Sequence, residues 1–272
     1  MRKVTSMKYQ FAILLGTSLA CVALPHAGAA QYNSPVTRHE RQSSQDWSEQ
    51  DRIDQTYRLA AGTHIELSTI YGPVDVETSD SDSAEVHIVR YARSREDLTS
   101  RKISIELTAK GLAIRGEKDR SEEPMKVRHR VIMRVPRNVD LSAESINGHL
   151  NVGEVNGTVS IHRINGAVRV DRAGGHAEVS QVNGSLQMTL AQLVPQGLDI
   201  KRINGTVNLR FAADLNADLA VAEFNGAVNV NMPNTSILHK VQRQAFRARI
   251  GLGGPPISIS DVNGSVRLDP AG

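Results

Sequence analysis

Apolar and polar residues follow a nine-residue period along the chain from about residue 144 onward. Counted from the Asn of each Asn-Gly pair, the positions one before, three after and five after are apolar in nearly every repeat, as in "INGHLNV" at 146–152. The alternation at positions three and five is the two-residue period of a strand that buries one face. The pattern therefore predicts a series of short strands separated by sharp corners.

The corners are marked by Asn-Gly pairs at 147, 156, 165, 183, 204, 225 and 263. Such a pair is typical of a tight β-hairpin, but a two-residue turn would set Ile146 against His149 and send Leu150 to the opposite face. If the chain instead bends inward at each pair, all three apolar columns face one interior. We therefore expect strands stacked in parallel, with Gly accommodating a positive φ and stacked Asn side chains bonding one another.

Two nine-residue units make one turn of this pattern, and short insertions before 195 and 216 lengthen it. Fixed-period repeats of this size are typical of solenoids, because one repeat cannot bury its own apolar face. The sequence thus predicts an all-β protein, a β-solenoid of 18–21-residue coils with a β-rich N-terminal cap or lobe. The longer interval from 225 to 263 is expected to hold an extra irregular coil or a loop with some helix.

The first thirty residues have the features of a secretory signal peptide. Arg2, Lys3 and Lys8 precede an apolar run over 11–23, which is followed by small residues up to Ala30. The run is short for a membrane span, so we expect cleavage after 29 or 30, no transmembrane segment afterwards, and a product in the periplasm, at the cell surface or secreted. Acylation at Cys21 is a weaker alternative, because Ser occupies a position where a lipoprotein signal favours Leu.

The remaining chain divides by composition into three parts. Residues 31–52 have few apolar residues and predict a disordered leader. Residues 53–143 contain alternating runs that predict a β-rich N-terminal lobe. Residues 144–270 form the repeat array, with 231–253 as an irregular insertion.

Charge and cysteine content exclude several classes of protein. The chain has 32 Lys+Arg and 29 Asp+Glu, and the predicted signal peptide contains three of the basic residues and none of the acidic ones, so the mature chain is nearly neutral. No dense basic stripe replaces the lost charge, which argues against a nucleic-acid partner. The single cysteine lies in the signal peptide, so the exported product has no disulfide.

No catalytic motif, metal-ligand pattern or cofactor fingerprint is found in the sequence. Every second corner of the repeat is always Asn-Gly, and the most distinctive polar feature is the fourth position after the Asn of these corners. Side chains at this position face outward between two buried positions. This column predicts a ladder of hydrogen-bonding groups that would bind an extended polymer, although an ordinary solvated face explains it too. Its members are Asn151, Arg169, Gln187, Asn208, Asn229 and Arg267.

The segments "STIYGPVDVET", "VIMRVPRNVDLSAESINGHLNV" and the serial "INGxVxV" units resemble a bacterial putative adhesin domain family of unknown function, related to the head domain of auto-transporter adhesins. The resemblance covers about residues 53–268. It implies a β-helical module of an envelope or secreted protein.

Three functions remain open at this stage. The first is a non-catalytic exported module that binds a glycan, peptidoglycan or protein partner of the envelope. The second is a carbohydrate-active β-helix enzyme, a lyase or hydrolase, for which Glu178 and Asp199 are candidate carboxylates on one face. The third is a structural or stress-responsive envelope protein that engages another protein by edge-strand addition.

Overall fold

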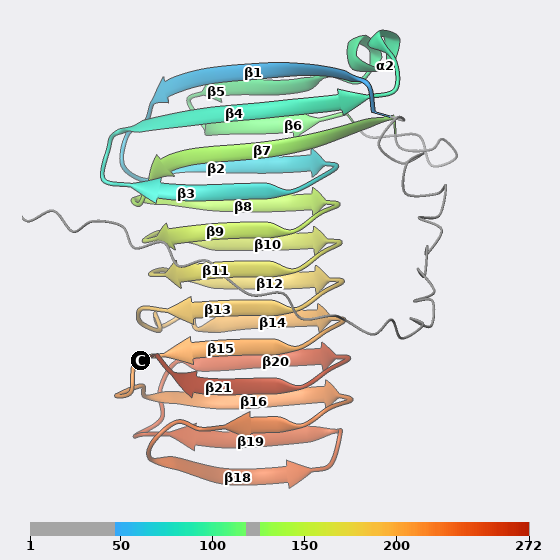
Figure 1. The fold of residues 1–272 in the computed structure, drawn as a ribbon. Coiled ribbons are helices and arrows are strands. Elements are labelled where there is room, and N and C mark those ends of the chain that lie inside the picture. The colour runs from blue at the N-terminus through green and yellow to red at the C-terminus, as the bar shows by residue number, and fades with distance from the viewer. Residues whose placement is uncertain (1–46, 118–125, 272) are drawn as a thin grey trace, which may run out of the picture. The chain divides into compact units, whose positions relative to one another are not determined.

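Two large β-sheets make up most of the described chain (Figure 1). The computed structural model describes residues 47–117 and 126–271. The predicted signal peptide with Cys21, and the predicted leader as far as residue 46, lie outside these residues. The first strand already begins at Glu49, inside the segment expected to be a leader.

Sheet 1 contains ten strands, eight of which, from β7 to β17, lie side by side in parallel. At the other end of this sheet, β4 is antiparallel to both of its neighbours, β1 and β7. In spatial order, sheet 1 consists of β1 (Glu49–Arg58), β4 (Ser83–Ala92), β7 (Val127–Pro136), β3 (Val74–Ser79), β9 (Leu150–Val155), β11 (Val168–Ala173), β13 (Leu186–Leu190), β15 (Val207–Phe211), β21 (Val266–Pro270) and β17 (Val228–Val230).

Sheet 2 contains eleven strands with a parallel centre and an antiparallel strand pair at each end. In spatial order it consists of β18 (Thr235–Val241), β19 (Ala245–Ile250), β16 (Ala217–Phe224), β20 (Pro256–Val262), β14 (Leu198–Ile203), β12 (Ala177–Val182), β10 (Val159–Ile164), β8 (Val139–Ile146), β2 (Thr63–Ile70), β6 (Gly111–Gly116) and β5 (Ile103–Thr108). One short helix, α2 (Arg95–Ser100), follows β4, and the Ser94 hydroxyl caps it by accepting from the Asp97 N–H at 3.1 Å.

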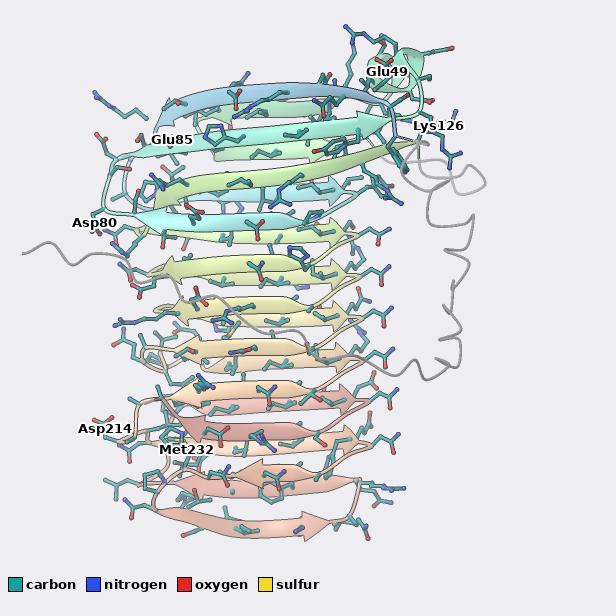
Figure 2. The ribbon with its side chains drawn as sticks, viewed as in Figure 1. Glu49, Asp80, Glu85, Lys126, Asp214 and Met232 are labelled. Atoms are coloured by element: carbon teal, nitrogen blue, oxygen red, sulfur yellow. The ribbon has the colours of Figure 1, made fainter. Side chains whose placement is uncertain are left out.

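One hydrophobic core lies between the two sheets and draws on nearly every strand of both. The three predicted apolar columns are buried, as in β9, where Leu150, Val152 and Val155 face the core and the residues between them do not. The core is aliphatic, with only three buried phenylalanines, Phe211, Phe224 and Phe246, among the described residues. Side chains on the other face of each strand point outward and repeat from strand to strand (Figure 2).

The prediction of an all-β protein is confirmed, but the prediction of a β-solenoid is wrong. The described residues form two large mixed sheets, with antiparallel strands at both ends, and no closed solenoid. The segment 231–253 is an antiparallel hairpin of β18 and β19, not an irregular coil or a partly helical loop. The final strands also leave the order of the sequence, because β20 lies between β14 and β16, and β21 lies between β15 and β17.

The physical reason for the error is that hydrophobic alternation determines which face of a strand is buried, and says nothing about its neighbour or direction. Strands of equal pattern can pair with any partner whose apolar face belongs to the same core. In this chain the hairpin β18–β19 pairs with the free edge of β16, and β20 inserts on the other edge of β16. The periodic pattern is identical in either arrangement.

The corner at Asn156 carries the chain from sheet 1 to sheet 2, and the other six Asn-Gly corners carry it from sheet 2 to sheet 1, as between β8 and β9. Their Asn side chains form a ladder in which each amide Nδ2 donates to the next amide oxygen at 2.9–3.1 Å. The expected stacking of Asn side chains is therefore confirmed. The ladder runs in the spatial order Asn147, Asn165, Asn183, Asn204, Asn263 and Asn225.

The expected role of the corner glycine is wrong, because the positive φ lies elsewhere. It falls on the residue two before each Asn of the ladder, for example Ser145 (φ 57°) and Gln181 (φ 58°). This left-handed residue breaks the alternation of β8, so that Ile146 rather than Ser145 turns toward the core. The glycine is needed for a different reason, which is that the corners stack at backbone contact distance.

No helix within residues 47–117 and 126–271 has the length and apolar character needed to cross a membrane.

Candidate binding surface

The predicted polar column forms a continuous row across sheet 1. Each of its six residues lies on a different strand, and the strand pairing places neighbours directly beside one another. The row reads Asn151, Arg169, Gln187, Asn208, Arg267 and Asn229, so the inserted strand β21 exchanges the last two positions relative to the sequence. Each member lies between two core residues of its strand, which directs its side chain outward.

Two members of the row are engaged by neighbouring carboxylates. The Asn151 Nδ2 donates to Asp75 Oδ1 at 2.8 Å, and the Arg169 Nε donates to Asp171 Oδ1 at 2.8 Å. The other four, Gln187, Asn208, Arg267 and Asn229, make no side-chain hydrogen bond within the described part of the chain. Their donors and acceptors are therefore free to meet a ligand in place of water.

At the Asn151 end, the row opens into a shallow depression of about 820 Å³. Gly153 lines it and takes the outward position that Asp171, Thr189 and Arg210 occupy in the following repeats. A Cβ on Gly153 would lie 2.9 Å from the Thr78 Oγ1, so the site leaves no room for a side chain. The hydroxyl of Thr78 also accepts a hydrogen bond from the Glu154 N–H at 3.0 Å, which holds this part of β9 against β3.

Alternating charges line the walls of the depression. The carboxylates of Asp75, Glu77, Glu154 and Asp171 and the guanidinium groups of Arg130, Arg137 and Arg169 all border it. Arg137 pairs with Asp80 and lies 3.4 Å from the Glu154 carboxylate, and Arg134 lies 3.3 Å from the Glu77 carboxylate. The hydrogen bond to Asp80 raises the pKa of Arg137 above its ordinary value. The depression is thus a set of paired charges rather than a field of one sign.

Sequence reasoning missed this depression, because β3 and β7, which form one of its walls, come from the segment before the repeats. One signal was present in the sequence. Gly153 in "NVGEV" replaces the longer side chain that most other repeats carry at that position.

The opposite face, on sheet 2, brings Glu178 and Asp199 directly beside each other on β12 and β14. The Lys201 ammonium lies 2.6 Å from the Asp199 Oδ2, and this contact raises the pKa of Lys201 above its usual range. Ser160 and Ser258 flank the pair on the neighbouring strands. Within the described residues, no group of three or more His, Cys, Asp or Glu is arranged to hold a metal ion.

Comparison with known proteins adds little to this picture. No family model matches the sequence, and no curated protein matches it. A putative cell adhesion protein from Clostridium sporogenes is similar in structure, with 10% identity and a TM-score of 0.39 over 81% of this chain and 100% of the other. A putative adhesin from Bacteroides fragilis gives 11% identity and a TM-score of 0.37 over 80% of this chain and 97% of the other. Similarity at this level assigns no activity or ligand to the chain.

Proposed function

We propose that the protein is a non-catalytic, exported binding module of the bacterial envelope or surface, and that the outer face of sheet 1 binds an extended envelope polymer such as a glycan or peptidoglycan strand. The observation that carries this proposal is the in-register row from Asn151 to Asn229. A row of side chains from adjacent strands has a repeat of about 4.8 Å, so six strands present groups over about 24 Å. A ligand that matches this surface is long and itself repetitive.

The chemistry of the row suits a neutral or mixed-charge polymer. Asn and Gln side chains each present an acceptor and two donors, and Arg presents only donors. Hydroxyl, acetamido and carboxylate groups of a saccharide chain have complementary donors and acceptors. The free side chains of Gln187, Asn208 and Arg267 lie on three consecutive strands and form the centre of this surface.

The arrangement of carboxylates favours binding over hydrolysis. A glycosidase needs two carboxyl groups at a defined separation, one of which acts as an acid. On sheet 2, Asp199 is bound to Lys201, and on sheet 1 the carboxylates of the depression are paired with arginine or amide side chains. Each of these carboxylates therefore already has a side-chain partner other than a second carboxyl group.

The binding part of the proposal is tested by co-sedimentation of the purified mature chain with insoluble peptidoglycan and with insoluble glycans. The variant Gln187→Ala/Asn208→Ala/Arg267→Ala is expected to lose at least tenfold in retention. The control variant Ser142→Ala/Glu178→Ala/Ser258→Ala removes outward side chains from sheet 2 and is expected to bind as the unmodified chain does. Absence of retention by any polymer at low salt, or equal losses in both variants, would contradict the proposal.

The export part is tested independently by expressing the full chain in a bacterial host and sequencing the N-terminus of the product. We expect it to begin at Ala30 or Gln31 and to be recovered outside the cytoplasm. A cytoplasmic product that still starts at Met1 would contradict export while leaving the binding result unaffected. A product acylated at Cys21 would show that the exported chain is anchored to a membrane instead of being released by cleavage after residue 29 or 30.

A further inference from the structure

The two sheets end differently at the side of the described unit where β18 lies (Figure 1). Sheet 2 continues past β16 with β19 and β18, whereas β17 is the last strand of sheet 1. β18 pairs only with β19, and β17 pairs only with β21. The outer edge of each last strand therefore offers N–H and C=O groups that no described strand engages, and such edges are templates for a further strand.

The edge strand β18 is exposed and carries large apolar side chains. Ile237 and Leu238 have exposed fractions of 60% and 59%. Ile237 lies directly opposite Ala248 in the antiparallel pair, so it points to the same face of the sheet as Ala248 does. Ala248 is buried, and Ile237 is not. The apolar face of sheet 2 therefore becomes exposed at its last strand, β18.

The same end has a strong charge bias. Residues 224–260 contain no Asp or Glu, and they contain Lys240, Arg243, Arg247 and Arg249. Arg249 lies 3.3 Å from the Asp218 carboxylate. The other three cations are exposed, and none forms an ion pair within the described residues. A partner that covers Ile237 and Leu238 therefore lies next to three uncompensated positive charges.

We propose that this end binds an acidic polypeptide segment in an extended conformation, which adds a strand to β18. The free edge of β18 supplies main-chain hydrogen bonds, and alternate apolar residues of the segment lie beside Ile237 on the face of Ala248. The acidic side chains between them lie on the opposite face, which carries Arg247. Lys240 and Arg243 add positive charge at the turn end of the hairpin. A second copy of the same edge is unfavourable, because it would bring the same cations and no acidic residue into contact.

The proposal is tested with three fluorescein-labelled ten-residue peptides and the mature chain, by fluorescence anisotropy. The first alternates valine and glutamate, the second alternates valine and lysine, and the third is the acidic peptide with proline at two valine positions. We expect the acidic peptide to bind at least tenfold more tightly than the basic one. We expect proline to abolish binding, because it removes strand hydrogen bonds.

Two variants of the chain separate edge recognition from general charge attraction. Lys240→Glu/Arg243→Glu/Arg247→Glu is expected to reverse the preference in favour of the basic peptide. The control Arg172→Glu/Arg202→Glu/Arg210→Glu changes the net charge equally on distant strands and is expected to keep the original preference. Circular dichroism verifies that both variants remain folded. Ile237→Ser is a milder change at the edge that leaves the charge unaltered, and it is expected to weaken the binding of the acidic peptide.

Other occupants of the edge give different results in parallel measurements. Light scattering would detect a dimer. If the chain dimerises, if Ile237→Ser abolishes the dimer and if the peptide does not affect it, a second copy of the chain occupies the edge and the proposal is overturned. Co-sedimentation with phosphatidylglycerol vesicles, without peptide binding, would overturn it in favour of a lipid surface. Binding of both charged peptides with equal affinity would overturn it as well. The sheet 1 variants of the polymer experiment are expected to leave peptide binding unchanged.

Discussion

The backbone at Gly166 passes so close to Gly148 that a Cβ atom on Gly166 would lie 2.3 Å from the Gly148 carbonyl oxygen. The same relationship repeats along this edge of the sheets, with 2.4 Å between a Cβ on Gly184 and the Gly166 oxygen. These corners stack directly on one another, so each glycine is required by the backbone of its neighbour.

We therefore predict that Gly166→Ala lowers the free energy of unfolding by about 2–3 kcal/mol, because an added methyl group forces the stacked corners apart. The measurement is urea unfolding followed by circular dichroism. Gly174→Asn is the matched control. Gly174 occupies the position that is Asn at most other corners, and its Cβ would lie 3.1 Å from the Asn156 Cα, so the substitution is expected to change stability by less than about 1 kcal/mol. Equal destabilisation by both would contradict the explanation.

The Asn ladder predicts a difference between its middle and its end. Asn183 donates to Asn165 and accepts from Asn204, whereas Asn225, at the end, only donates to Asn263. Asn183→Ala is expected to cost about 1–2 kcal/mol of stability, and Asn225→Ala about half as much, since each hydrogen bond contributes about 0.5–1.5 kcal/mol. Chemical denaturation of both variants measures the difference. An equal or larger loss for Asn225→Ala would show that the amide ladder is not what these side chains contribute.

Local features of this fold were accessible from the sequence because they depend on neighbouring residues. The burial of Leu150 and Val152 follows from a period of two, and the stacking of Asn147 on Asn165 follows from an 18-residue interval. The reason for the corner glycine was not accessible. A positive φ and a close backbone contact both favour glycine, so the sequence does not distinguish them. The structure shows that the positive φ belongs to Ser145 and the close contact to Gly148.

The arrangement of the strands was less accessible, because it depends on contacts between distant segments. Nothing in the pattern of 256–270 indicates that β20 pairs with β14, more than fifty residues earlier, instead of following β16 in order. The outward direction of the side chains in the row on sheet 1 follows from strand parity alone, since the strands share one core, but the order of its last two members, Arg267 and Asn229, does not. The depression over Gly153 was not accessible, because it needs β3 and β7 beside β9.

The left-handed residues before each corner give a third prediction. Gln181 has a φ of 58° and an exposed side chain, so the Cβ strain of this conformation, about 1–2 kcal/mol, is not offset by a side-chain hydrogen bond. Gln181→Gly is expected to stabilise the chain by up to about 1 kcal/mol, and Gln181→Val to destabilise it by about 1 kcal/mol. At Gln187, which lies in the extended strand β13, the Val variant is expected to be more stable than the Gly variant. Thermal unfolding measures the order of stability at both positions. A common order at both positions would exclude backbone strain as the cause.

The last prediction concerns His129, which is buried in β7 with an exposed fraction of 4%. Its Nδ1 accepts a hydrogen bond from the Tyr71 N–H at 3.2 Å, and its Nε2 has no partner within the described residues. Burial, assisted by the positive charge of Arg90 and opposed by the negative charge of Asp51, lowers the pKa of His129 from 6.5 to about 4. The folded state therefore holds the imidazole in its neutral form.

Because the folded pKa lies below the ordinary value of 6.5, the unfolded chain binds more protons between pH 4 and 6.5. The contribution of His129 to the free energy of unfolding is fully present above pH 6.5. It decreases by about 3 kcal/mol in total as the pH falls toward 4. Urea unfolding from pH 4 to 7.5 measures this slope. His129→Leu is expected to be less stable at neutral pH but to lose stability less steeply on acidification, whereas His239→Gln, at an exposed position on β18, is expected to keep the full slope. An unchanged slope in His129→Leu would show that the carboxylates, rather than this buried imidazole, account for the acid sensitivity.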